Sequence, residues 1–291
     1  MKNGHAAQLS LKTLSLFPVL FALLSLSVSA QDLLQSQGIG AIFQQIHDRD
    51  NHKINAPIYE NGSGDLFQEL GAQPHESYQK TIELADQFNP KNKSNDHNRL
   101  RDEIDEYVEY LGQFETIQYA LEATNTDLDD LRKNWFGQGR GFEHTLNGEI
   151  KGTKVGGYHW WYRYYVDQQD GKVEYVKTKT GASDQNIFAG SFKWDPDGNG
   201  PLPNAYKSFG GFTVGHSAHA MMALGHVAME FAKRNGKKGG FVFEAPFRGK
   251  SYHWQVYIMG GSLRSFYAKA PNGRNIHSRD ALFDLVFAQS E

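Results

Sequence analysis

The sequence predicts an α+β fold, with a helical N-terminal region followed by an antiparallel-sheet-rich region that contains a few helices. Residues 31–136 place apolar side chains at the three- and four-residue spacing of amphipathic helices. Residues 137–291 contain short runs rich in aromatic and β-branched residues, separated by turn signals. Strands joined by hairpins, with the helices segregated from them, are typical of an antiparallel α+β fold.

The first thirty residues predict an export signal, residues 1–30. Lys2 and Lys12 give positive charge before the apolar run Leu14–Val28, and Ala30 ends a stretch of small residues suited to a signal peptidase. The uncharged stretch of residues 13–30 is also close to the minimum length of a spanning helix, so a membrane anchor is the alternative. We expect cleavage, a secreted or periplasmic protein, and no membrane association afterwards.

The region of residues 31–136 predicts helices. One amphipathic helix is expected from Leu100 to Leu121, because apolar residues recur there with charges between them. Asn125 to Asp127 offer a cap for a shorter helix that reaches Trp135. Glycines at positions 137, 139 and 141 then break the helical pattern, so we place the boundary between the two regions there.

The region of residues 137–291 predicts mainly strands. We expect a strand over Tyr158–Val166, a turn at residues 170–171, and a second strand that starts at Val173. A helix is expected over His216–Arg234. Further strands are expected in three later segments, which are residues 241–243, Tyr252–Met259 and Leu263–Tyr267.

Composition limits the chemistry. The chain has no cysteine, so disulfides, thiol nucleophiles and thiolate zinc sites are excluded. The net charge is −3, but residues 31–140 hold 20 acidic and 10 basic side chains, whereas residues 141–291 hold 13 acidic and 18 basic ones. The basic C-terminal part is what a polyanion-binding region would show.

Two histidines and a lysine in this basic region carry the candidate chemistry. His144 ends the motif Gly-Phe-Glu-His, His159 lies within Gly-Tyr-His-Trp-Trp, and Lys207 follows further along. Cleavage of RNA through its own 2′-hydroxyl needs a base, an acid and a cation near the phosphate. Histidine suits both proton transfers. On spacing alone, ordinary structural histidines are the alternative, because spacing without geometry carries little information.

These motifs, with Gly148-Glu149 between them, resemble the signature of the EndoU, or poly(U)-specific endoribonuclease, family. The resemblance implies that His144 and His159 are the acid–base pair, with His159 as base and His144 as acid, and that Lys207 stabilises the phosphate. It implies cleavage of single-stranded RNA, not DNA, at uridylates, to give 2′,3′-cyclic phosphate and 5′-hydroxyl ends. An immunity or inhibitor protein is a candidate partner.

The resemblance also implies that Ser265 and Tyr267 bind the substrate base. Alternation places both on one face of a predicted strand, and in the resembling family such a pair reads the nucleotide. The chemistry requires no cofactor, although some family members depend on Mn²⁺ or Ca²⁺. Glu143 and Glu149 are therefore weak candidate metal ligands. Asp195–Gly200 matches the start of a calcium loop but has Tyr206 where the acidic ligand belongs, so we expect a turn.

The predicted helix after Lys207 departs from the family where it begins with His216, Ser217, Ala218 and His219, because relatives carry a Ser-Pro-Glu-like start. His219 and His226 lie two helical turns apart, on the order of 10 Å, which is too far to share one metal. We interpret the three histidines as polar helix positions, since a zinc site needs three or more protein ligands.

Two other functions remain open on the sequence. One is a metal-dependent nuclease or phosphodiesterase that uses Glu143, His144, Glu149 and His159 as ligands. The other is a non-catalytic, secreted RNA- or glycan-binding module that stacks ligands on an aromatic segment, residues 160–164. The two differ from the two-histidine mechanism in chelator sensitivity and in the RNA ends produced.

We predict that the mature protein begins at Gln31, because the small residues before it fit signal peptidase cleavage. N-terminal sequencing of the exported protein checks this site. Exported protein that still begins at Met1 contradicts it.

Overall fold

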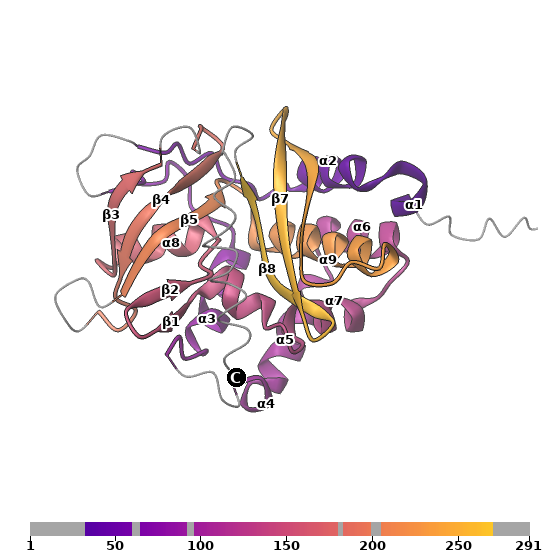
Figure 1. The fold of residues 1–291 in the computed structure, drawn as a ribbon, viewed down its shortest axis with the longest axis horizontal. Helices are drawn as coiled ribbons and strands as arrows, with labels where there is room; N and C mark the ends of the chain where they lie inside the picture. The colour runs from indigo at the N-terminus through magenta and orange to yellow at the C-terminus, as the bar shows by residue number, and fades with distance from the viewer. Residues whose placement is uncertain (1–32, 60–64, 92–95, 180–182, 199–204, 270–291) are drawn as a thin grey trace, which may run out of the picture. The chain divides into compact units, whose positions relative to one another are not determined.

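The computed structural model describes residues 33–59, 65–91, 96–179, 183–198 and 205–269 (Figure 1). All of these residues belong to one compact unit. The predicted signal sequence, residues 1–30, lies outside the described residues. Among the residues that are described, no helix has both the length and the apolar character needed to cross a membrane.

The N-terminal part is helical, as predicted. Its helices are α1 (Leu33–Gln37), α2 (Ile39–Arg49), α3 (Glu76–Asp86), α4 (Asp96–Arg99), α5 (Arg101–Leu111), α6 (Glu115–Thr124) and α7 (Leu128–Phe136). The side chain of Asp127 accepts a hydrogen bond from the backbone N–H of Asp130 at 3.0 Å and so caps α7. The predicted cap and the short helix after it are confirmed.

The prediction of one helix from Leu100 to Leu121 is wrong, because the chain divides there into α5 and α6. Gly112 ends α5, and Phe114 takes an extended conformation with φ −85° and ψ 133° before α6 begins. Glycine is a poor helix former, and the bend lets α6 pack against α9 (Ala218–Arg234). The apolar spacing continues across the bend because both helices bury side chains in the same core.

The predicted α+β class is confirmed by two sheets (Figure 1). The larger sheet has the order β1-β2-β5-β4-β3, and its neighbours are antiparallel except β2 and β5. Its strands are β1 (Glu149–Lys151), β2 (Lys154–Gly156), β3 (Val173–Thr178), β4 (Ile187–Trp194) and β5 (Ala205–Thr213). The smaller antiparallel sheet contains β6 (Gly240–Phe247), β7 (Lys250–Met259) and β8 (Ser262–Lys269).

The prediction of a strand over Tyr158–Val166 is wrong, because Trp161–Gln169 forms helix α8. The aromatic content favours a strand locally, but tertiary packing decides the outcome. Trp161, Tyr164 and Gln168 recur at helical spacing and are all buried. Tyr164 packs against aromatic rings of β4 and β5, so α8 covers one face of the larger sheet. Residues 170–171 form a turn between α8 and β3, not a hairpin turn.

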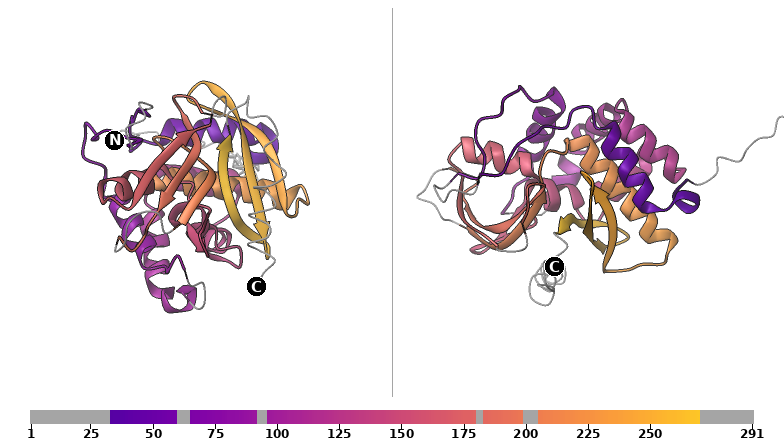
Figure 2. Two further views of the ribbon diagram at one scale, coloured as in Figure 1. Left: turned by 60° about the vertical axis from the view of Figure 1, so that its left-hand side comes forward. Right: turned by 90° about the horizontal axis from the view of Figure 1, so that it is seen from above.

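The two sheets meet where β5 contacts β8. In the left view of Figure 2 the yellow strands of the smaller sheet lie beside the strands of the larger sheet. Helices α2 and α9 cover one face of the smaller sheet. Phe43 of α2 lies edge-on to Phe243, Trp254 and Phe266, which come from all three strands of that sheet. The junction between β5 and β8 brings together residues of both sheets.

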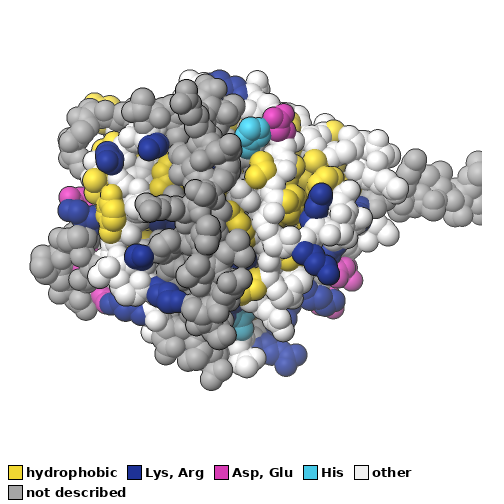
Figure 3. All heavy atoms as spheres, viewed as in Figure 1, with side chains coloured by type: hydrophobic (Ala, Val, Ile, Leu, Met, Phe, Trp, Pro, Cys, Tyr) yellow, Lys and Arg dark blue, Asp and Glu magenta, His cyan; other side chains and the backbone are white. Residues whose placement is uncertain are grey.

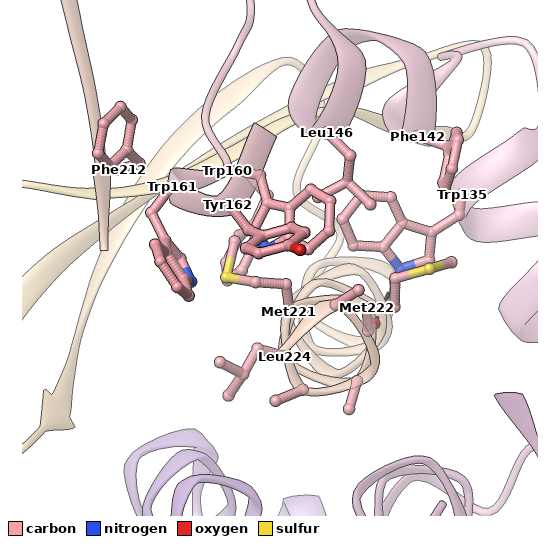
Figure 4. Close-up of a cluster of buried hydrophobic side chains, with 14 of the residues drawn as sticks. Trp135, Phe142, Leu146, Trp160, Trp161, Tyr162, Phe212, Met221, Met222 and Leu224 are labelled. Atoms are coloured by element: carbon pink, nitrogen blue, oxygen red, sulfur yellow. Dashed lines mark hydrogen bonds between the residues drawn. The ribbon is translucent and has the colours of Figure 1, made fainter. Parts of the chain in front are cut away.

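Helix α9 forms the centre of the core (Figure 4). Fourteen of its seventeen residues are buried, so it is enclosed on nearly every side. The indole N–H of Trp135 in α7 donates to the carbonyl of Met222 at 2.8 Å, which fixes the ring against α9. The same helix explains the three histidines that we interpreted as polar helix positions. His219 and His226 lie on this helix and His216 lies two residues before it, and all three are buried.

We predict that Gly225→Ala destabilises the protein although alanine is the better helix former. A Cβ atom at this position would lie 2.2 Å from Cζ2 of the fixed Trp135 ring. The overpacking cost of about 2–3 kcal/mol exceeds the propensity gain of about 1 kcal/mol. Urea unfolding measures the difference in the free energy of unfolding.

Gly40→Ala is the matched control, because this helical glycine has only Pro246 Cδ nearby, at 3.7 Å. It should stabilise the protein by roughly 0.5–1 kcal/mol. Equal effects of the two substitutions would show that Trp135 does not limit the space at position 225.

Candidate active site

The structure brings the two predicted histidines together. His144 lies in η1 (Glu143–Asn147), a single π-helical turn, and His159 lies in the loop between β2 and α8. Two backbone hydrogen bonds join these segments: the N–H of Tyr158 donates to the carbonyl of His144 at 2.8 Å, and the N–H of His159 donates to the carbonyl of Thr145 at 2.6 Å. The imidazole centroids are 6.2 Å apart. A π-helical turn of this kind is often found at functional sites.

Gly157 makes this close approach possible. Its φ is +61°, and a Cβ atom on it would lie only 1.7 Å from the carbonyl oxygen of His144. Any side chain at this position would push η1 and the His159 loop apart. The glycine of the Gly-Tyr-His motif is therefore required sterically, because a residue with a Cβ atom does not fit there.

The His159 ring is held by its Nδ1 atom and by an aromatic stack. Nδ1 lies 2.8 Å from the carbonyl oxygen of Gly211 in β5, and a carbonyl only accepts, so Nδ1 is the donor. In the neutral ring the lone pair is then on Nε2. The ring also stacks on Tyr267 of β8, with centroids 4.1 Å apart and planes 10° apart. His159 is thus fixed by one strand from each sheet.

The His144 ring is held by a carboxylate that is itself paired. Nδ1 of His144 lies 3.1 Å from Oε2 of Glu149, which can only accept when ionised. Both guanidinium NH₂ groups of Arg264 donate to Glu149, one of them at 2.9 Å to Oε1. All three side chains are at most 2% exposed. A bidentate arginine fixes the plane of a carboxylate, so Arg264 orients Glu149 and Glu149 orients His144.

Glu143 points to different partners. Its Oε1 atom contacts Nε2 of His97 and lies 3.9 Å from Nε of Arg140. The two predicted metal ligands, Glu143 and Glu149, are thus engaged with separate basic side chains. Among the residues that the structure describes, no group of three or more His, Asp or Glu side chains is arranged to hold a metal ion. Dependence on Mn²⁺ or Ca²⁺ stays a prediction.

Lys207 lies on β5, the strand whose Gly211 carbonyl holds His159. The lysine is 7% exposed and is paired in register with Phe192 of β4. Gly210 leaves room for its stem, because a Cβ atom there would lie 3.0 Å from Cγ and 3.1 Å from Cε of Lys207. The third predicted catalytic residue is therefore on an element of the site.

Ser265 and Tyr267 lie on β8, opposite Tyr257 and Gln255 of β7. Both are buried, and the ring of Tyr267 lies on His159. The hydroxyl of Ser265 is fully buried and has no hydrogen-bond partner among the described residues. The structure thus places Tyr267 at the histidine pair and Ser265 two residues before it on the same strand.

Sequence reasoning missed one residue of this site, Arg264. It orients the carboxylate beside His144, and its signal was a charged side chain inside the predicted strand Leu263–Tyr267. The loop of Asp195–Gly198 forms the expected turn, in which the N–H of Gly198 donates to the carbonyl of Asp195 at 3.2 Å. Residues 199–200 of that loop lie outside the described residues.

A protein-family model, Endoribonuclease XendoU, matches residues 42–268, which include every part of this site. The chain belongs to the XendoU endoribonuclease family. The predicted family resemblance is confirmed. The solved structure of XendoU, a splicing-independent snoRNA-processing endoribonuclease, superposes on this family member with a TM-score of 0.62 at 15% identity. It covers 79% of this chain and 96% of that chain, so the two share a fold.

Named relatives of this XendoU-family chain match over part of their length. The mouse uridylate-specific endoribonuclease is 29% identical over 154 residues, which are 47% of this chain and 34% of that protein. Uridylate-specific endoribonuclease D of Xenopus laevis is 26% identical over 200 residues, which are 63% of this chain and 62% of that protein. The chain therefore matches about a third of the mouse protein and less than two thirds of the frog protein.

Proposed function

We propose that this chain is an endoribonuclease that cleaves single-stranded RNA at uridylates. The observation that carries the proposal is the histidine pair, in which each ring is fixed through Nδ1, one by a carbonyl and one by a carboxylate. The family match and the names of the relatives support RNA as the substrate. Basic side chains on the face of the larger sheet, which Figure 3 shows in dark blue, suit a polyanion.

In the proposed reaction His159 is the general base. Its Nε2 lone pair takes the proton of the 2′-hydroxyl, and the 2′-oxygen attacks the adjacent phosphorus. The O2′–P bond forms and the P–O5′ bond breaks, which gives a 2′,3′-cyclic phosphate. The neutral Gly211 carbonyl at Nδ1 suits a ring that starts the reaction neutral.

His144 is the proposed general acid, which protonates the departing 5′-oxygen. An acid must start as imidazolium, and the Glu149 carboxylate at Nδ1 balances that charge. Arg264 keeps the carboxylate in place. Lys207 supplies positive charge to the phosphorane, so these steps use only side chains of this chain.

We predict that His144→Ala, His159→Ala and Lys207→Ala each lower cleavage of a uridine-containing oligonucleotide by about 10²- to 10⁴-fold, the usual contribution of such groups. The rate should depend on pH as a bell-shaped curve. His253→Ala is the control, because His253 is a surface residue of β7 that pairs with Glu244. Near-normal rates in either site-histidine variant would remove that residue from the mechanism.

The same assay separates the proposed mechanism from a metal-dependent nuclease. A cyclic phosphate end that forms in the presence of chelator supports the two-histidine reaction. Loss of cleavage with chelator, restored by Mn²⁺ or Ca²⁺, would assign a cation to the site.

We propose that Ser265 and Tyr267 select the base. The buried Ser265 hydroxyl has its hydrogen-bonding capacity available for a pyrimidine edge, since no described residue uses it. A site built around a hydrogen bond discriminates through that bond. Tyr267 already stacks on His159, so a base that stacks on this ring would lie next to the general base.

We predict that Ser265→Ala reduces the preference for uridine over cytidine, whereas Tyr267→Ala lowers cleavage about ten- to a hundredfold, as expected from loss of a stacking contact. Matched oligonucleotides with a single uridine or a single cytidine measure both effects. An unchanged base preference in the first variant, together with a normal rate in the second, would place both residues outside the substrate site.

A further inference from the structure

Five histidines that the proposed reaction does not use lie together at one end of α9. This histidine cluster consists of His47 near the end of α2, His52 in the segment after α2, His75 at the start of α3, and His216 and His219 at the start of α9. His52 stacks on His75 with centroids 3.7 Å apart, and Nδ1 of His52 lies 3.1 Å from Nε2 of His219. The rings of His47 and His216 lie edge to face at 5.4 Å.

The surroundings of the cluster hold more cations than buried carboxylates. Asp50 is fully buried, accepts from the N–H of Ser217 at 3.0 Å, and lies 4.0 Å from Nε2 of His219. Lys53 and Arg248 donate to backbone carbonyls of the same segment. The titratable or charged groups that face the cluster come from α2 and the segment after it, from α3 and from the β6–β7 hairpin; they are Asp48, Asp50, Lys53, Tyr78, Arg248 and Tyr252.

The cluster is connected to the proposed base by two short routes. The indole N–H of Trp161, two residues after His159, donates to the carbonyl of His216 at 2.7 Å. Nδ1 of His216 also lies 3.0 Å from the hydroxyl of Thr213, two residues after the Gly211 carbonyl that holds His159. His216 is therefore hydrogen-bonded to two residues, Trp161 and Thr213, that lie within two positions of the His159 loop and of its Gly211 partner.

We propose that the histidine cluster is a pH-sensitive latch of the ribonuclease site, a role that rests on the proposed function. With neutral rings, the cluster holds the start of α9 against the end of α2 and keeps the His159 loop in place. Protonation puts like charges within contact distance in a buried, cation-rich junction. The junction then opens, the His159 loop loses the supports that run through Trp161 and Thr213, and cleavage falls before the whole protein unfolds.

The direction of the pH effect follows from the burial of these rings. Burial, with Lys53 and Arg248 nearby, lowers the pKa of His47 to about 4 and the pKa of His216 well below its ordinary value. Burial, with His52 and His75 nearby, lowers the pKa of His219 to about 3. The open form, with ordinary histidine pKa values near ~6.5, therefore binds more protons, and the closed form loses stability as pH falls below that value.

Hydrogen exchange on the whole protein tests the latch without any RNA. Ordinary histidines take up protons between about pH 7.5 and about pH 5. Over this range, the amide exchange rate of residues 157–161 and 211–219, corrected for intrinsic rates, should rise at least tenfold more than the rate of α7. The double variant His216→Asn/His219→Gln, which cannot be protonated at these positions, should remove most of this local rise. His226→Gln is the matched control, because His226 is also buried on α9, with its pKa lowered to about 4, but contacts Asn134 and Thr126 instead of the cluster.

Cleavage of a uridine-containing oligonucleotide supplies the second readout. The quantity compared is the cleavage rate at pH ~5 divided by the rate at neutral pH. This ratio should be about tenfold larger in the double variant than in wild type or in His226→Gln. Uniform exchange changes across the wild-type protein would overturn the latch, even if the double variant does not fold. If the cleavage rate falls by the same factor at acidic pH in wild type and in the double variant, the latch is also overturned. A wild-type protein that shows local opening but cleaves no RNA would instead contradict the proposed function.

Discussion

The contact between residue 157 and the carbonyl of His144 is the constraint on which the rest of the site depends. Only hydrogen fits between the backbone of Gly157 and that oxygen, and the fit allows two backbone hydrogen bonds to join η1 to the His159 loop. These bonds fix the two imidazoles relative to each other before any side-chain interaction is considered. The other contacts then set how each ring is oriented and hold Nδ1 of each ring against a fixed oxygen.

Buried polar side chains extend this local constraint into the fold. Asp167 of α8 accepts hydrogen bonds from the hydroxyl of Tyr158, the indole of Trp194 and the guanidinium of Arg163. Tyr158 lies directly between Gly157 and His159, so α8 and β4 help to position the loop. Buried polar groups stabilise a single arrangement when each is paired. The chain has no cysteine, so no disulfide holds this loop. The hydrogen bonds to Asp167 hold it instead.

Helix α9 connects the proposed chemistry to the remainder of the molecule. Its buried length supports Trp135 and the aromatic residues that follow His159, and its first turn contributes His219 to the histidine cluster. The proposed latch therefore lies at the place where the helical part and the site share residues. Burial there lowers the pKa of His47, His216 and His219 and so favours the neutral rings.

The sequence by itself determined the α+β class, the cap of α7, helix α9, the strands of the smaller sheet, and the motifs that carry His144 and His159. These features depend on apolar spacing, turn residues and motif order, all of which act over a few positions. Tertiary structure decided the bend at Gly112, the helix over Trp161–Gln169, the burial of His216 and His219, and the pairing of Glu149 with Arg264. The members of that pair are 115 residues apart. Local patterns cannot specify such outcomes, because a side chain's burial and its partners depend on which distant segments the completed core places beside it.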